Sequence, residues 1–418
     1  MSEFLVTGGR KLAGELSVQG AKNSVLPIMA AALLVPGKTV LHNCPDLSDV
    51  RTAMEILSQL GCAVSREGHT LVIDARDIIS HAVSEQLMRG MRSSVIFLGA
   101  ILARCAAAQL SFPGGCELGP RPIDLHLDAL RQMGYEIDAH ASSISCMAKS
   151  PRAAQITLAF PSVGATENVM LAATACRGTT RIINAAMEPE IVDLQEFLRA
   201  AGAHVTGAGT PVIEITGDAP LKECEYTVMP DRIAAVTWLC AAAATGGHIR
   251  LPNAVAAHIA SVLSVLKTCG CELDLTQGVE LRAPARPSSA GTIKTLPYPG
   301  FPTDAQAIVM ALMCTACGST MFEETIFENR YRHVEGLTRM GAHIHVTGRV
   351  AMVTGVPRLT GAAAEASDLR GGAALVAAAL SAEGESIIGG VHHIDRGYEH
   401  MEDALCTLGA EIKRRACV

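Results

Sequence analysis

The sequence predicts an α/β protein of two similar domains, each built from three repeats whose short strands surround buried helices. Three observations lead to this fold class. The chain has 418 residues, which is more than one average domain holds. A helix that ends in glycine and is followed by a strand is indicated six times. An alanine-rich helix that is apolar on nearly every face is also indicated six times.

The first repeating signal places a glycine between an amphipathic helix and a short strand, as in LSQLGCAVS around Gly61. A glycine here fits the position just after a helix, where a left-handed backbone angle ends it. The six glycines are Gly61, Gly134, Gly202, Gly270, Gly341 and Gly409. The steps between them are 73, 68, 68, 71 and 68 residues, so six repeats account for essentially the whole chain.

The second signal is the alanine-rich helix, which belongs in a core because it has no polar face. The six helices are expected to begin near Lys22, Arg92, Ser162, Arg232, Asp304 and Arg370, at steps of 70, 70, 70, 72 and 66 residues. Each repeat therefore contributes one buried helix, one amphipathic outer helix and several short strands. Three repeats per domain would wrap sheets around three inner helices.

The beginnings of the inner helices point to an anion site. Free N–H groups and the helix dipole attract anions there. Four of the six beginnings carry Lys or Arg, although the net charge of the chain is −7. We expect Ser24, Ser93 and Asp368 to act mainly as helix caps. Capping does not explain Lys22 or Arg92, so ligand binding is favoured for those two. If the two domains face each other, the helix starts would form a positive cleft for an anionic small substrate.

Three outer helices are also preceded by arginines, namely Arg121, Arg330 and Arg396. The planar guanidinium suits phosphate and carboxylate groups. We expect Arg121 and Arg396 to bind a ligand, whereas Arg330 fits a ligand contact and a solvated surface position equally well.

The segment from Pro113 to His126 carries the most distinctive chemistry. Glycines on both sides of Cys116 allow unusual backbone angles, and prolines on both sides of Arg121 stiffen the chain. A thiol near a cation and a helix start has a lowered pKa and becomes reactive. We therefore expect a loop that presents a reactive cysteine.

Several classes of protein are disfavoured. The acidic balance and the lack of a basic stripe with aromatic residues argue against nucleic-acid binding. The longest apolar run, about residues 233–245, is too short to span a membrane. The first residues lack the features of a signal peptide. We therefore expect a cytoplasmic protein. The fourteen cysteines include one C-x-x-C pair and no second pair, so no metal site is predicted. The oligomeric state is not evident.

These motifs together resemble a known family. They are Gly20-Ala21-Lys22-Asn23, the Pro-Gly-Gly-Cys loop with Arg121 to His126, Ser162 to Thr166, Phe301 to Asp304, Phe327 to Arg330, and Asp395 to Glu399. In this order they are similar to the UDP-N-acetylglucosamine 1-carboxyvinyltransferases, the enolpyruvyl transferases of bacterial cell-wall synthesis. The resemblance runs from about Leu5 to Lys413.

The resemblance implies an inside-out α/β barrel fold of six βαβαββ-like units. It implies one domain of residues 22–229 and another of residues 1–21 plus 230–418, with the active site in the cleft between them. The implied reaction moves the enolpyruvyl group of phosphoenolpyruvate to the 3′-hydroxyl of UDP-N-acetylglucosamine and releases phosphate, by addition and then elimination. It is the first committed step of peptidoglycan synthesis and uses no metal or organic cofactor.

Residue roles carry over from the family by position. Cys116 would protonate the methylene carbon of phosphoenolpyruvate or form an adduct with it, and Asp304 would be the general base; Lys22 and Arg396 also count as catalytic. The implied phosphoenolpyruvate-binding residues are Lys22, Asn23, Arg121, Arg330, Arg370 and Arg396. The implied nucleotide-sugar-binding residues are Asn23, Arg92, Arg121, Pro122, Ile123, Asp124, Leu125, Ser162, Val163, Gly164, Asp304 and Ile326.

Three other functions are compatible with parts of the sequence. The chain could be a catalytically silent paralogue that binds nucleotide sugar as a regulator. It could act on shikimate 3-phosphate, although that sister family lacks the cysteine loop. A cysteine hydrolase that uses Cys116 and His126 is least favoured, because no third group is evident to orient the histidine. Phe160 stands where some family members have a lysine near the diphosphate, which puts that one contact in doubt.

Overall fold

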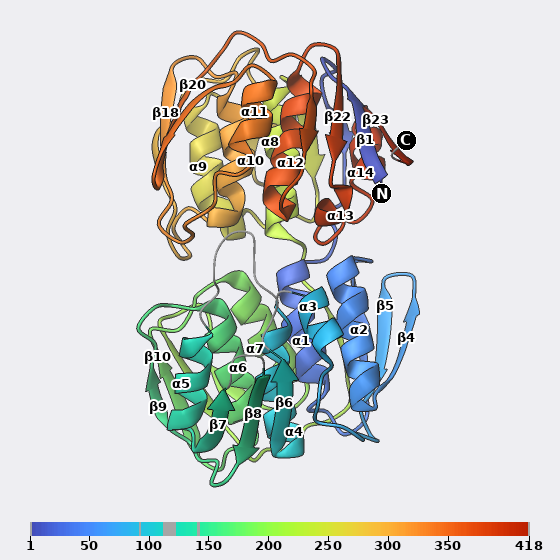
Figure 1. Cartoon of the computed structure of the whole chain (residues 1–418), viewed down its shortest axis with the longest axis vertical. Helices are drawn as coiled ribbons and strands as arrows, with labels where there is room; N and C mark the ends of the chain where they lie inside the picture. Colours follow the sequence, from blue (N-terminus) through green and yellow to red (C-terminus); the bar gives the residue numbers. More distant parts are fainter. Residues whose placement is uncertain (1, 92, 112–122, 140–142, 417–418) are drawn as a thin grey trace. The chain divides into compact units, whose positions relative to one another are not determined.

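The computed structural model describes residues 2–91, 93–111, 123–139 and 143–416. Within these ranges the chain forms two compact units, each with its own hydrophobic core (Figure 1). Unit 1 contains the described residues of 2–19 and 230–416, and unit 2 contains those of 20–229. The first strand of the chain therefore belongs to the same unit as the last.

Unit 2 is built around three inner helices, α1 (Lys22–Ala32), α4 (Phe97–Cys105) and α6 (Val163–Ala173). Nearly all their residues are buried. The amphipathic outer helices are α2 (Ser48–Leu60), α5 (Asp124–Gln132) and α7 (Pro189–Ala200), and a short α3 (Glu85–Gly90) precedes the second inner helix.

Three small sheets accompany the helices of unit 2. The first has the order β13-β3-β5-β4, formed by Cys224–Thr227, Lys38–His42, Thr70–Asp74 and Ala63–Glu67. The second has the order β6-β8-β7, formed by Ala107–Ser111, Ser143–Ala148 and Tyr135–Ala139. The third has the order β11-β12-β10-β9, formed by His204–Thr206, Val212–Thr216, Thr179–Ile183 and Gln155–Thr157. Because β13 pairs in parallel with β3, the last strand of this unit completes the sheet of its first repeat.

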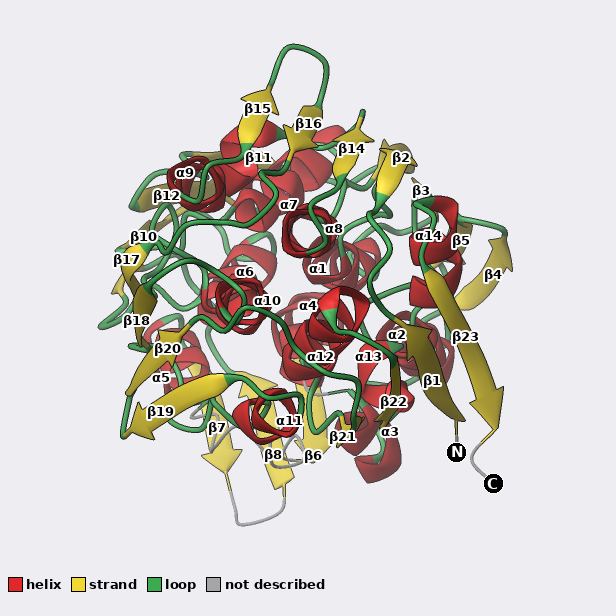
Figure 2. Ribbon diagram, turned by 90° about the horizontal axis from the view of Figure 1, so that it is seen from above, coloured by secondary structure: helices red, strands yellow, loops and turns green. Residues whose placement is uncertain are grey.

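Unit 1 repeats the plan around α8 (Arg232–Ala244), α10 (Thr303–Met313) and α12 (Leu369–Ser381), which pack against one another. Figure 2 shows these three helices at the centre of the unit with its strands around them. The outer helices are α9 (Ala260–Thr268), α11 (Val334–Arg339), α13 (Val391–Ile394) and α14 (Met401–Thr407).

The sheets of unit 1 use the N-terminal strands. One has the order β15-β16-β14-β2, formed by Glu272–Asp274, Val279–Arg282, His248–Leu251 and Ala13–Glu15. The next has the order β17-β18-β20-β19, formed by Gly291–Lys294, Ser319–Glu323, Val350–Thr354 and His343–Thr347. The last has the order β21-β22-β1-β23, formed by Ala363–Glu365, Glu385–Gly389, Ser2–Thr7 and Glu411–Ala416.

The six predicted glycines follow the outer helices as expected. All have a positive φ, from 86° at Gly409 to 113° at Gly61, and a strand begins two residues after each, or one residue after Gly134. A side chain is strained at such angles, so glycine fixes the end of each outer helix. The predicted six-fold repeat and the α/β fold class are confirmed.

Three local predictions were wrong. The second inner helix begins at Phe97, after a 3-10 turn at Ser94–Ile96, and not near position 92. Ser24 does not cap α1, because its hydroxyl donates to the Asp193 carboxylate. Ser93 makes no capping bond either, and its Oγ is buried without a partner among the described residues. The cap predicted at Asp368 is confirmed, since its Oδ1 accepts the N–H groups of Arg370 and Gly371 at 3.0 Å each.

Candidate active site

The first group of predicted site residues lies at the start of inner helix α10 in unit 1. Asp304 sits in the first turn of this helix, where the dipole favours a carboxylate. Arg330 donates from Nη2 to Asp304 Oδ1 at 2.9 Å and to the Thr303 carbonyl at 3.1 Å. Arg370, from the first turn of α12, donates to Asp304 Oδ2 at 3.2 Å. Both arginine side chains are 4% exposed and Asp304 is 29% exposed, so the carboxylate is the accessible member of the group.

The electrostatics of this group follow from its geometry. Burial alone would raise the pKa of Asp304, but Arg370, Arg330 and Arg232 outweigh it and hold that pKa well below its usual range. Burial lowers the pKa of Arg370, and the Asp304 charge reverses this, so the guanidinium stays protonated. Asp304 is therefore ionised at neutral pH. An effective general base has a pKa near the operating pH. While both arginines bond Asp304, its pKa lies far below neutral pH, so the carboxylate is a weak base.

The first turn of α12 contains two glycines, Gly371 and Gly372, although glycine is a weak helix former. A Cβ on Gly371 would lie 2.8 Å from Asp368 Oδ2 and 3.1 Å from the His333 Cβ. A Cβ on Gly372 would lie 2.7 Å from Ile394 Cγ1. The helix nevertheless runs unbroken from Leu369, because tertiary packing compensates for the weak propensity of glycine.

Arg396 lies between α13 and α14, in a segment joined to the same group. Tyr398, two residues after Arg396, is buried, and its hydroxyl accepts from Arg370 Nη1 at 3.2 Å. That hydroxyl also lies 2.7 Å from Thr237 Oγ1 on α8. The structure thus links Asp304, Arg330, Arg370 and the Arg396 segment within one unit.

Glu324, which the sequence analysis did not single out, connects Ile326 to this group. Glu324 is 1% exposed, and its Oε1 accepts from the backbone N–H of Ile326 at 2.9 Å. Its Oε2 accepts from Thr303 Oγ1 at 3.0 Å. Glu324 therefore ties the loop of Ile326 to the start of α10, and no motif singled it out because its bond to Thr303 spans 21 positions.

Lys22 is the first residue of α1 in unit 2, where a cation opposes the helix dipole. Its ammonium forms a 2.7 Å ion pair with Asp49 from the first turn of α2, with side chains 10% and 2% exposed. Asn23 follows and is half-buried. Asp49 compensates the buried charge of Lys22, and nothing in the sequence around it indicated this.

The nucleotide-sugar residues predicted at the start of α6 lie beside those predicted at the start of α5. Ser162 caps α6, accepting from the Ala165 N–H at 3.4 Å, and Val163 and Gly164 form its first turn. A Cβ on Gly164 would lie only 2.8 Å from His126 Cε1. His126 is buried on α5, two residues after Asp124, and its Nδ1 lies 2.8 Å from Asn168 Nδ2.

This contact brings Ile123, Asp124 and Leu125 close to the N-terminus of α6. Phe160, two residues before the cap of α6, is 44% exposed. Four predicted site residues lie outside the described part of the chain: Arg92, Cys116, Arg121 and Pro122.

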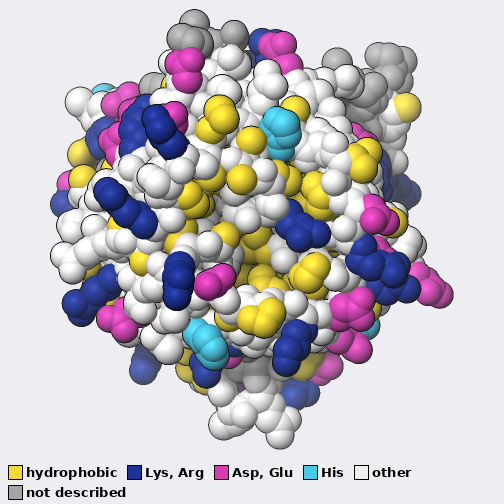
Figure 3. All heavy atoms as spheres, turned by 90° about the horizontal axis from the view of Figure 1, so that it is seen from below, with side chains coloured by type: hydrophobic (Ala, Val, Ile, Leu, Met, Phe, Trp, Pro, Cys, Tyr) yellow, Lys and Arg dark blue, Asp and Glu magenta, His cyan; other side chains and the backbone are white. Residues whose placement is uncertain are grey.

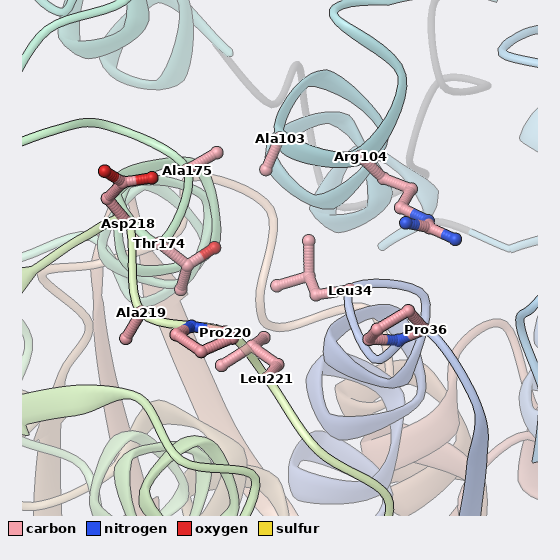
Figure 4. Close-up of a pocket in the computed structure, with 10 residues that line it drawn as sticks. All are labelled: Leu34, Pro36, Ala103, Arg104, Thr174, Ala175, Asp218, Ala219, Pro220 and Leu221. Carbon is pink, nitrogen blue, oxygen red and sulfur yellow. The ribbon is translucent and has the colours of Figure 1, made fainter.

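A cavity of about 390 Å³ in unit 2 lies at the other end of the inner helices (Figure 4). Leu34, Ala103 and Thr174 line it, and they stand at or just beyond the C-terminal ends of α1, α4 and α6. It is therefore separate from the helix starts that carry Lys22 and Ser162. On the molecular face of Figure 3, apolar side chains gather near the middle, and basic and acidic side chains are interspersed around them.

The described residues contain no group of three or more His, Cys, Asp or Glu side chains that could hold a metal ion. No helix in this part of the chain is long and apolar enough to cross a membrane.

Comparison with known proteins gives the family. The family model described as EPSP synthase (3-phosphoshikimate 1-carboxyvinyltransferase) matches residues 6–405. The chain is 50% identical over 99% of its length to UDP-N-acetylglucosamine 1-carboxyvinyltransferase 2 of Caldanaerobacter subterraneus, all of which is covered. It is 44% identical to the UDP-N-acetylglucosamine 1-carboxyvinyltransferase of Rhodospirillum centenum, with 99% of both chains covered. The chain belongs to the UDP-N-acetylglucosamine 1-carboxyvinyltransferase family. It is therefore a transferase, as the motifs indicated.

Solved structures show the same fold. The enolpyruvyl transferase NikO from Streptomyces tendae superposes with a TM-score of 0.88 at 24% identity, over 99% of this chain and 98% of that one. An EPSP synthase from Acinetobacter baumannii superposes with a TM-score of 0.74 at 18% identity, over the whole of both chains. The predicted enolpyruvyl transferase fold is confirmed.

Proposed function

We propose that the protein transfers the enolpyruvyl group of phosphoenolpyruvate to the 3′-hydroxyl of UDP-N-acetylglucosamine and releases phosphate. The observation that carries the proposal is the full-length similarity, at 44–50% identity, to enzymes named for this transfer. Such a reaction would supply the first committed intermediate of peptidoglycan.

The addition step needs one proton donor and one proton acceptor. The sugar oxygen attacks C2 of phosphoenolpyruvate, its proton goes to Asp304, and the methylene carbon C3 receives a proton from Cys116. This gives a tetrahedral intermediate that still carries phosphate on C2. In the elimination step C3 returns a proton to the Cys116 thiolate, the C2–O bond to phosphate breaks and the double bond forms again, and the leaving phosphate takes the proton held by Asp304.

The arginines around Asp304 suggest how binding of phosphoenolpyruvate would raise the pKa of this base. Phosphoenolpyruvate brings a carboxylate, and we assign its binding to Arg330 and Arg370. That carboxylate then competes with Asp304 for the two guanidinium groups that bond it. When the two guanidinium groups also bond the substrate carboxylate, the pKa of Asp304 rises towards its ordinary value, and Asp304 accepts a proton more readily.

The remaining roles follow the motifs. Lys22, Arg121 and Arg396 would hold the phosphate, and Asn23 would orient the intermediate. Arg92, the segment from Arg121 to Leu125, Ser162 to Gly164, Asp304 and Ile326 would hold the nucleotide sugar. The proposal requires groups of both units to act on the same two substrates.

Two other functions are tested by the same reaction mixture. The protein is incubated with phosphoenolpyruvate and either UDP-N-acetylglucosamine or shikimate 3-phosphate, and products are identified by mass spectrometry. The proposal predicts an enolpyruvyl ether of the nucleotide sugar alone. An enolpyruvyl ether of shikimate 3-phosphate would assign the protein to the sister reaction. Binding of the nucleotide sugar without any product would indicate a silent paralogue.

A further inference from the structure

The segment 395–402, which carries Arg396, is held by the side chain of Gln19. The carboxamide of Gln19 donates from Nε2 to the Gly397 carbonyl at 3.1 Å. Its Oε1 accepts from the backbone N–H of Glu399 at 2.8 Å. One amide side chain therefore bonds a carbonyl and an N–H two residues apart. A carboxamide suits this arrangement because it has both a donor and an acceptor.

The backbone that carries Gln19 is itself fixed within unit 1. The Gln19 carbonyl accepts from the N–H of Asp231, the capping residue of α8, at 2.8 Å. The preceding residue, Val18, is bonded through both its N–H and its carbonyl to the carboxamide of Asn253, at 2.8 Å each. Gln19 thus reaches the Arg396 segment from an anchored position.

The ends of the same segment are bonded to Arg414 on β23. Its guanidinium donates to both oxygens of Asp395, at 2.9 and 2.7 Å, and to both oxygens of Glu402, at 2.5 and 3.1 Å. The Phe4 ring lies 5.0 Å from the same guanidinium. Arg414 therefore fixes the two ends, and Gln19 fixes the backbone between them.

The backbone of this segment does not hold its conformation by local preference. His400 has φ of 42°, a left-handed angle that is unfavourable for a residue with a side chain. A Cβ on Gly397 would lie 2.7 Å from Leu369 Cδ2, so the segment packs tightly against the start of α12. Strained backbone persists only where its surroundings impose it. The bonds from Gln19 and Arg414 are such surroundings.

We propose that Gln19 is a positioning residue for Arg396. Its carboxamide fixes the backbone on the C-terminal side of Arg396 and thereby the direction from which the guanidinium meets the phosphate of phosphoenolpyruvate. This inference rests on the proposed function, in which Arg396 binds that phosphate.

The test compares Gln19→Ala, Gln19→Glu and a control, Gln195→Ala, by steady-state kinetics. Gln19→Ala loses both bonds, whereas the carboxylate introduced by Gln19→Glu would keep the acceptor and lose the donor. The control likewise removes both bonds of a carboxamide, but in unit 2: Gln195 Oε1 accepts from the Ala208 N–H at 3.0 Å, and Gln195 Nε2 donates to Glu196 Oε1 at 3.0 Å. We expect kcat/KM for phosphoenolpyruvate to fall about tenfold or more in both Gln19 variants, on the scale of one lost hydrogen bond. The Kd of UDP-N-acetylglucosamine should stay within about twofold of wild type. The control should keep wild-type kinetics.

A double-mutant cycle with Arg396→Ala separates positioning from general destabilisation. If Gln19 acts through Arg396, adding Gln19→Ala to Arg396→Ala costs no further kcat/KM. Additive losses, or an unchanged kcat/KM in Gln19→Ala, would overturn the inference while wild-type turnover still upholds the proposed function. A wild type that makes no product from the two substrates would overturn both. If Gln19→Ala does not fold, Gln19→Glu alone decides through the same cycle.

Discussion

The carboxylate of Asp304 and the guanidinium of Arg370 form an ion pair across 3.2 Å at the starts of two neighbouring inner helices. Arg330 bonds the other carboxylate oxygen at 2.9 Å. The residue proposed as general base is thus bonded to the two arginines proposed to bind the substrate carboxylate. This relationship connects stability, pH dependence and catalysis.

Asp304→Asn should lower the stability of unit 1 at neutral pH. The pKa of Asp304 is lowered in the folded protein, so its ionised form stabilises the fold above the unfolded pKa of about 3.9. That contribution is lost as the pH falls through the lower folded pKa. We expect a loss of about 1–3 kcal/mol at pH 7 that becomes smaller at acidic pH. Urea unfolding at the two pH values measures it.

Asp128→Asn is the matched control for this change, because it breaks an exposed pair with Arg131 on α5. It should cost less than about 1 kcal/mol. Equal losses in the two variants, or a loss at Asp304 that does not depend on pH, would contradict the electrostatic account.

Asp304→Ala should reduce turnover far more than it weakens nucleotide binding. Removal of a general base typically costs about 10²–10⁴ in rate. The measurements are kcat under saturating substrates and the Kd of UDP-N-acetylglucosamine by calorimetry. Losses of equal size in kcat and in affinity would make Asp304 a ligand contact and not the base.

Asp49→Asn should destabilise unit 2 strongly, because it removes the counter-charge of a buried lysine. The Lys22–Asp49 pair is almost fully enclosed, and the loss of one partner from such a pair costs about 3–5 kcal/mol. Asp46→Asn, which alters a partly exposed pair with Arg51, is the control and should cost less than about 1 kcal/mol. Thermal and urea unfolding check both, and a similar small effect in the two variants would refute the prediction.

Cys116 should be alkylated before the other thiols, and electrophilic mimics of phosphoenolpyruvate should inactivate the protein through it. Most described cysteines are poor competitors. Burial raises the pKa of Cys44 and Cys314 to about 12, for example. Cys317 and Cys406 are the exposed thiols among the described cysteines, and they are the relevant comparison. Peptide mapping after limited alkylation checks this, and prior modification at either of these two would show that Cys116 is not selectively reactive.

The sequence predicted the repeats well because local physics sets them. Each glycine such as Gly61 ends a helix through its own backbone angle, and each inner helix is marked by its lack of a polar face. The pairing of Asp304 with Arg370 could not be predicted in this way, because the two residues are 66 positions apart and meet only when α10 and α12 pack together. Ser24 illustrates the same limit, since its partner Asp193 lies on a distant outer helix that no local capping rule includes.

The most direct test of the account is phosphate release from phosphoenolpyruvate, measured with and without UDP-N-acetylglucosamine, in the wild type and in Cys116→Ser. We expect the wild type to release phosphate only when the nucleotide sugar is present, in proportion to the enolpyruvyl ether formed. We expect Cys116→Ser to release it far more slowly. No release by the wild type, or release that does not depend on the nucleotide sugar, would contradict the proposed function.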